Sequence, residues 1–208
     1  MTLNLWLAFV AAAAILVAIP GPTVMLVVGY ALSHGRGSGR YTVPGVALGD
    51  VTAMSLSFIG LGALLSAAPA LFQWVQWAGA AYLVYLGVQL WRAPPVVAAA
   101  AVSSRAEPSW RMLGHAWAVT SLNPKGIVFF VAFVPQFLGR GAPVVPQLVL
   151  LGATFSVIAT LNSLAYALLA GTVRAAVSRP SLVRAIYRLG GSILIAAGIV
   201  TAALKHAT

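Results

Sequence analysis

The polar side chains that could carry chemistry are few, and the most informative ones lie inside long apolar segments. Asp50 is one of two acidic residues in the 208-residue chain, and no other charged residue lies in its segment. Lys125 and Asn162 lie in two later apolar segments. In nonpolar surroundings a lone carboxyl group can bind and release a proton, and a lysine can pair with an anionic group. Asp50 is therefore the candidate proton-exchanging residue.

Each of these residues also has a structural interpretation. Asp50 could pair with Lys125, or it could cap free backbone groups beside a helix break. Lys125 could pair with Asp50, attract a carboxylate, or extend its long side chain to the lipid headgroups. Asn162 could face Asp50 across a site, or form a plain interhelical hydrogen bond. The sequence leaves these alternatives open.

The first apolar segment is broken by two prolines at Ile19-Pro20-Gly21-Pro22-Thr23. Proline lacks the N–H group that bonds four residues back, and its ring clashes with the preceding turn. The carbonyl groups near Val17 and Ala18 therefore lose their partners, and inside a membrane only protein or water can satisfy them. The motif predicts a polar cavity within a helix bundle, with a simple kink as the alternative.

A helix that restarts at Pro22 presents unpaired N–H groups over Thr23 to Met25, together with the positive end of its dipole. This combination suits a carboxylate. Asn123-Pro124-Lys125 predicts a second break of the same kind. The candidate binding residues are therefore Pro20, Gly21, Pro22, Thr23, Asn123, Pro124, Lys125 and Asn162.

Composition places the chain in the membrane. It is 61% hydrophobic and 7% charged, with a mean hydropathy of +0.98, which is too apolar for a soluble globule. The net charge of +10 would suit nucleic acid in a soluble domain, but short basic loops are what membrane topology requires. Because the chain has no cysteine, disulfides and thiolate metal sites are excluded. We expect no cofactor and no bound metal.

An all-α fold with six membrane spans follows, because each apolar segment reaches the ~20 residues that cross a ~30 Å hydrocarbon core. The chain divides into a first three-helix unit (1–92), a polar linker on the cytoplasmic side (93–110) and a second three-helix unit (111–208). The expected spans are Leu3–Leu32, Tyr41–Leu65, Ala70–Trp91, Arg111–Leu138, Val144–Val173 and Tyr187–Leu204.

The two units resemble each other. Each begins with a proline-broken helix, and the third helix of each carries glycines with the same spacing, Gly79/Gly87 and Gly190/Gly198. Because three spans is an odd number, the second unit enters the membrane from the opposite side, which makes the repeat inverted. Broken helices at matching places in inverted repeats are typical of transporters with a site at the membrane midplane.

The basic residues predict the orientation. Lys and Arg number two over Arg36–Arg40, three over Arg92–Arg111 and four over Arg174–Arg188, against one at Arg140 and one at Lys205. Since basic loops stay in the cytoplasm, both termini are expected outside.

Several motifs in a fixed order resemble the LysE/RhtB family of bacterial amino-acid exporters over nearly the whole chain. They are Pro20-Gly21-Pro22, Gly35, Gly45, Gly49-Asp50, Gly79-Ala80-Ala81-Tyr82-Leu83, Gly87, Asn123-Pro124-Lys125, Phe129-Phe130 and Pro135-Gln136-Phe137. The resemblance implies an inner-membrane location and proton-driven amino-acid export. Family members often carry Asn or Asp after the first motif, where this chain has Thr23.

The sequence as a whole predicts a six-helix carrier that exports a small, neutral amino acid or derivative by alternating access. The alternatives are a carrier for another solute such as a metal cation, an intramembrane enzyme, or a structural bundle. An enzyme is disfavoured because a single acid and no histidine lie deep in the spans. The expected partners are the lipid bilayer, the amino acid and protons, without nucleic acid; a homo-oligomer stays an open alternative.

Overall fold

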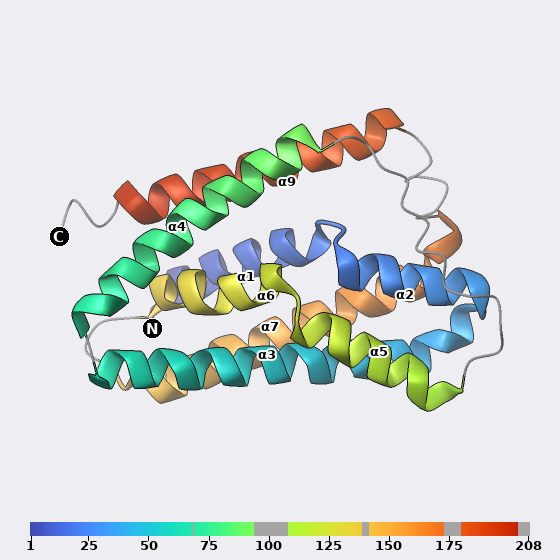
Figure 1. Cartoon of the computed structure of the whole chain (residues 1–208), viewed down its shortest axis with the longest axis horizontal. Coiled ribbons are helices and arrows are strands. Elements are labelled where there is room, and N and C mark those ends of the chain that lie inside the picture. The colour runs from blue at the N-terminus through green and yellow to red at the C-terminus, as the bar shows by residue number, and fades with distance from the viewer. Residues whose placement is uncertain (68, 94–107, 139–141, 173–179, 204–208) are drawn as a thin grey trace.

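The computed structural model describes residues 1–67, 69–93, 108–138, 142–172 and 180–203, and their side chains except at 64–73, 75–76 and 200–203. Every regular element in these ranges is helical, which confirms the all-α prediction. The long helices run side by side along one axis (Figure 1). They are α1 (Leu3–Ala18), α2 (Pro22–Ser33), α3 (Gly39–Ala67), α4 (Pro69–Arg92), α5 (Ser109–Ser121), α7 (Val144–Leu168) and α9 (Pro180–Ala203), with short elements η1 (Arg36–Ser38), α6 (Pro124–Val128), η2 (Phe129–Phe133) and η3 (Val134–Phe137).

Within the described ranges, three straight helices and two bent pairs are long and apolar enough to cross a membrane. The straight helices are α3, α7 and α9, and the bent pairs are α1 with α2 and α5 with the segment from Pro124 to Phe137. The protein is thus a multi-pass membrane protein. Helix α4 has 24 residues, or about 36 Å at ~1.5 Å per residue, which also suffices for a span. Six spans stays a prediction.

Several helix boundaries differ from the predicted ones. Helix α9 begins at Pro180, ahead of the expected start at Tyr187, because proline fits the first position of a helix. Helix α7 ends at Leu168, before Val173. Helix α5 begins at Ser109, inside the expected linker. Most of that linker, 94–107, lies outside the described residues.

Both predicted helix breaks are present. The helix axis bends by 54° between α1 and α2 and by 44° between α5 and the segment after Pro124. Ile19, Gly21 and Asn123 each precede a proline, and all three have extended backbone conformations. This follows from the clash of the proline ring with the residue before it, which disfavours the helical conformation there. Proline then starts both α2 and α6.

Each broken helix packs against the straight helix α3 or α7 of the other half of the chain. Helix α1 contacts α7, where the Trp6 indole donates a hydrogen bond of 3.1 Å to Thr154 Oγ1. Helix α5 contacts α3, where the Trp117 indole donates one of 3.1 Å to Thr52 Oγ1. The two halves are therefore interleaved rather than separate.

Helices α4 and α9 form an antiparallel pair along one side of the molecule (Figure 1). Glycines allow their backbones to approach closely. A methyl group at Gly87 would lie 2.6 Å from the Gly191 carbonyl oxygen, and one at Gly198 would lie 2.7 Å from that of Ala80. Gly79 instead faces Ala132 of η2. The glycine spacing noted in the sequence thus marks real packing faces.

A cluster of aromatic side chains supports the interior beside the first break. Phe129 and Phe130, both on the π-helical turn η2, are 1% exposed. Their ring centroids lie 5.3 Å and 4.8 Å from that of Phe155 on α7. Because the π-helical turn adds a residue to the helical repeat, it turns consecutive phenylalanines toward the same core.

Candidate functional site

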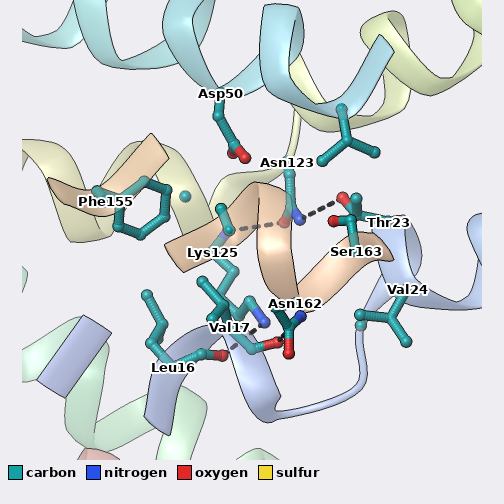
Figure 2. Close-up of a pocket in the computed structure, with 14 residues that line it drawn as sticks. Leu16, Val17, Thr23, Val24, Asp50, Asn123, Lys125, Phe155, Asn162 and Ser163 are labelled. Atoms are coloured by element: carbon teal, nitrogen blue, oxygen red, sulfur yellow. Dashed lines mark hydrogen bonds between the residues drawn. The ribbon is translucent and has the colours of Figure 1, made fainter. Parts of the chain in front are cut away.

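A cavity of ≈ 50 Å³ lies beside the break between α1 and α2. Its wall includes residues from α2, α3, α6 and α7 as well as the end of α1 (Figure 2). It has room for no more than a few water molecules, so a larger guest would have to displace side chains. The residues that line it are Leu16, Val17, Gly21, Thr23, Val24, Val46, Asp50, Asn123, Lys125, Gly126, Phe155, Ala159, Asn162 and Ser163.

The Lys125 ammonium binds the C-terminal end of α1. Its Nζ atom donates hydrogen bonds of 3.0 Å to the carbonyl oxygens of Leu16 and Ile19. Both carbonyl groups lie at the negative end of the helix dipole. The Leu16 carbonyl oxygen also accepts a hydrogen bond of 3.3 Å from the Ile19 N–H group, in place of the N–H group that Pro20 lacks. In this structure Lys125 therefore neither pairs with Asp50 nor extends to the headgroups.

Two side chains of α7 satisfy the remaining carbonyl groups of the break. Asn162 Nδ2 donates to the Val17 carbonyl oxygen at 3.0 Å, and the Tyr166 hydroxyl donates to that of Ala18 at 2.8 Å. The freed carbonyl groups predicted from the sequence are thus satisfied by protein side chains. Asn162 both lines the cavity and makes an interhelical bond.

Asn123 joins the two breaks. Its Oδ1 atom accepts a hydrogen bond of 3.1 Å from the Lys125 backbone N–H and so caps α6. Its Nδ2 atom donates to Thr23 Oγ1 at 3.2 Å, and Thr23 Oγ1 in turn lies 3.3 Å from Thr120 Oγ1. This chain of bonds fixes the start of α2 against α5 and α6 (Figure 2).

The start of α2 lacks such a cap. Gly21 is its N-cap residue and supplies no side chain, and Pro22 has no N–H group. In the described part of the chain, no side chain accepts a hydrogen bond from the N–H groups of Thr23 and Val24, which line the cavity. The Met25 N–H group, also expected to be unpaired, instead donates to the Gly21 carbonyl oxygen at 2.9 Å. This end keeps the positive dipole and free donors that bind anions, whereas α6 is capped by its own Asn123.

Asp50 reaches the same cavity from α3 (Figure 2). It is only 9% exposed. Among the residues that the structure describes, no hydrogen bond or ion pair holds its carboxyl group. It is therefore a buried carboxyl group without a direct hydrogen-bond or ion-pair partner among the described residues.

Most of the predicted binding residues come together. Five of the eight line the cavity, namely Gly21, Thr23, Asn123, Lys125 and Asn162, whereas Pro20, Pro22 and Pro124 shape the breaks without lining it. Asp50, the candidate proton-exchanging residue, lines the same cavity. Sequence reasoning missed Ser163, the neighbour of Asn162, and did not foresee that Tyr166 caps α1. A hydroxyl group in a membrane helix gives no signal in one sequence that separates a site from packing.

An all-α membrane protein whose polar cavity lies at a helix break has the architecture typical of membrane transporters. Residues 14–204 match the family described as LysE type translocator, and the chain belongs to this family. Its members are translocators rather than enzymes.

Several relatives span nearly the full chain, and two of them illustrate the similarity. One is a homoserine/homoserine lactone efflux protein of Salmonella typhi, 30% identical over 207 residues and 100% of both chains. Another is an uncharacterized membrane protein of Vibrio cholerae, 30% identical over 99% of this chain and 100% of its own. A leucine efflux protein of Enterobacter sp. is 34% identical over 67% of this chain and 66% of its own. No solved structure gives a significant match.

Proposed function

We propose that this protein exports a small, zwitterionic amino acid across the bacterial inner membrane by alternating access. The observation that carries the proposal is the uncapped start of α2, which lies at the wall of a cavity lined in part by polar side chains. An amino-acid carboxylate fits such a helix end. The names of the relatives, which are efflux proteins for homoserine and for leucine, support this substrate class.

Two inverted three-helix units, 1–92 and 111–208, are part of the proposal. Support comes from the interleaved packing of the halves and from the antiparallel pairing of α4 with α9. The start of α1 and the end of α9 lie at the same end of the bundle (Figure 1), which agrees with an even number of spans. The basic starts of α3, α5 and α9 lie at the other end, which we assign to the cytoplasm.

Asp50 carries the coupling proton in this proposal. It and Lys125 are the two titratable residues of the cavity lining. Asp50→Asn keeps the shape of the side chain and removes its titration. The variant should insert and fold normally and still exchange internal for external substrate in proteoliposomes, yet lose uphill efflux driven by an imposed pH gradient.

The matched control is Glu107→Gln, which removes the other acid of the chain, in the predicted linker. It should retain gradient-driven efflux. Full gradient-driven efflux in well-folded Asp50→Asn protein would eliminate Asp50 as the proton carrier.

The transport activity itself is tested with an amino-acid panel. Overproduction should protect cells against toxic levels of the transported amino acid, and vesicles preloaded with that amino acid should release it faster when they contain the protein. Homoserine and leucine are the first candidates. If no amino acid is released faster than from empty vesicles, the proposed function is wrong.

A further inference from the structure

Lys125 places a primary ammonium group on the broken end of α1. Its Nζ atom lies between two backbone carbonyl oxygens, Leu16 O and Ile19 O, each at 3.0 Å. A methyl group at Gly21 would lie 3.5 Å from the same Nζ atom, so the ammonium sits directly against the break. Two carbonyl acceptors at the negative end of a helix dipole form a site suited to an ammonium ion.

The free N–H groups of α2 lie on the other side of the same break. Ile19, whose carbonyl group accepts from Lys125, is separated from Thr23 by only the Pro20–Pro22 motif. Leu16 at the end of α1 and Thr23 at the start of α2 thus line one cavity from adjoining helix ends. In an α-amino acid the ammonium and the carboxylate are attached to the same carbon atom. The break therefore offers complementary partners for both charged groups of one small molecule.

The cavity is too small to receive that molecule while Lys125 remains in place. Its ≈ 50 Å³ holds no more than a few water molecules. Asp50 lines the same cavity and has no hydrogen-bond partner in the described part of the chain (Figure 2). A displaced Lys125 ammonium can therefore leave the α1 carbonyl groups and pair with this carboxylate.

We propose that the C-terminal end of α1 is the subsite for the substrate's ammonium group, and that Lys125 is its tethered occupant in the empty carrier. The arriving ammonium takes the carbonyl oxygens of Leu16 and Ile19, and Lys125 moves to Asp50. This inference rests on the proposed function, since it assumes an amino-acid substrate.

The movement of Lys125 between α1 and Asp50 links substrate binding to the protonation of Asp50. Ionised Asp50 gives the displaced Lys125 a partner and so favours the loaded carrier, whereas protonated Asp50 offers no anionic partner and favours the return of Lys125 to α1. Among the described residues, no other titratable side chain lines the cavity. Amino acid and proton thus occupy the carrier alternately, which is what antiport requires.

The direct test observes the Lys125 ammonium. Lys125 and Lys205 are the two lysines of the chain, so a Lys205→Arg protein labelled with ¹⁵N-lysine gives a single side-chain Nζ resonance. The probes are leucine and homoserine, each compared with its 2-hydroxy acid, which has a hydroxyl in place of the ammonium group. The amino acid that binds by calorimetry should shift the Nζ resonance, and its hydroxy acid should leave it in place.

A pair of variants tests the competition. Lys125→Met removes the tethered ammonium, and the Kd for the amino acid should fall at least tenfold because nothing has to be displaced. Tyr166→Phe is the matched control, since it removes another donor to the same helix end, at Ala18 O, from a residue outside the cavity lining. It should not tighten binding.

Each outcome decides the question. Amino-acid binding with an unmoved Nζ resonance, or Lys125→Met protein that binds no more tightly than the wild type, overturns the inference and leaves the proposed export intact. If Lys125→Met does not fold, the resonance in Lys205→Arg protein decides alone. If no amino acid of the panel binds or is exported, the proposed function and the inference fail together.

Discussion

Replacing Gly49 with alanine tests the close packing of α3 on α5 beside the cavity. A methyl group there would lie 2.6 Å from Thr120 Cβ and 2.8 Å from the Trp117 carbonyl oxygen, closer than real carbon contacts allow. The carbonyl group belongs to the backbone and cannot rotate away, so the two helices must separate. The matched control is Gly60→Ala on the same helix, where the added methyl meets no atom within 4 Å.

The two substitutions share the gain in helix propensity and differ in the cost of overpacking. Alanine is favoured over glycine in a helix by about 1 kcal/mol, and Gly60→Ala should gain up to that amount. At Gly49 the same gain is opposed by overpacking of about 1–3 kcal/mol. Gly49→Ala should therefore be less stable than Gly60→Ala by about 1–3 kcal/mol.

Unfolding by SDS in mixed micelles, followed by circular dichroism, measures this difference in free energy. A second readout is the binding of the transported amino acid. It should weaken in Gly49→Ala alone, because Thr120 hydrogen-bonds Thr23 at the cavity wall. Equal stability of the two alanine variants would refute the packing argument.

Three further predictions concern orientation, selectivity and the break. Reporter fusions should report a cytoplasmic location at Ser38, Ser103 and Arg179. They should report an external location at Ala68, Gly141 and Thr208, and a cytoplasmic C-terminus would overturn the inverted repeat. Overproduction should protect cells better against neutral amino-acid analogues than against lysine or arginine analogues. A cationic side chain would have little to pair with, because Asp50 is the single acid in the described lining of the cavity. The reverse order would contradict a neutral substrate. Asn162→Leu leaves the Val17 carbonyl without its donor and should lower the free energy of unfolding in SDS by about 0.5–1.5 kcal/mol, and an unchanged value would mean that water replaces the bond.

The positions of both helix breaks were predictable because proline acts through local geometry. Pro20 and Pro124 remove N–H groups and force the residue before them out of the helical conformation, whatever the rest of the chain does. The isolated Asp50 was equally visible, since a carboxyl group is costly in an apolar segment. All three features depend on the bilayer and on neighbouring residues alone.

The partners of these groups were not predictable. The sequence left Lys125 with three alternatives, and the structure gives it a fourth, the end of α1. That contact joins residues more than a hundred positions apart and depends on how the halves interleave, which spacing in one chain does not determine. The role of Tyr166 was unpredictable for the same reason, because it follows from the closeness of α7 to Ala18.

The capping of α1 also constrains the order in which the protein can mature. The donors for its last carbonyl groups, Lys125, Asn162 and Tyr166, all belong to the second half of the chain. When the chain is inserted during synthesis, the first half enters the membrane before these residues have been made. The nascent break then has only water or translocon groups as hydrogen-bond partners. The first three helices therefore cannot form all their final hydrogen bonds alone, and the α1 break is fully hydrogen-bonded only after the two halves have packed together.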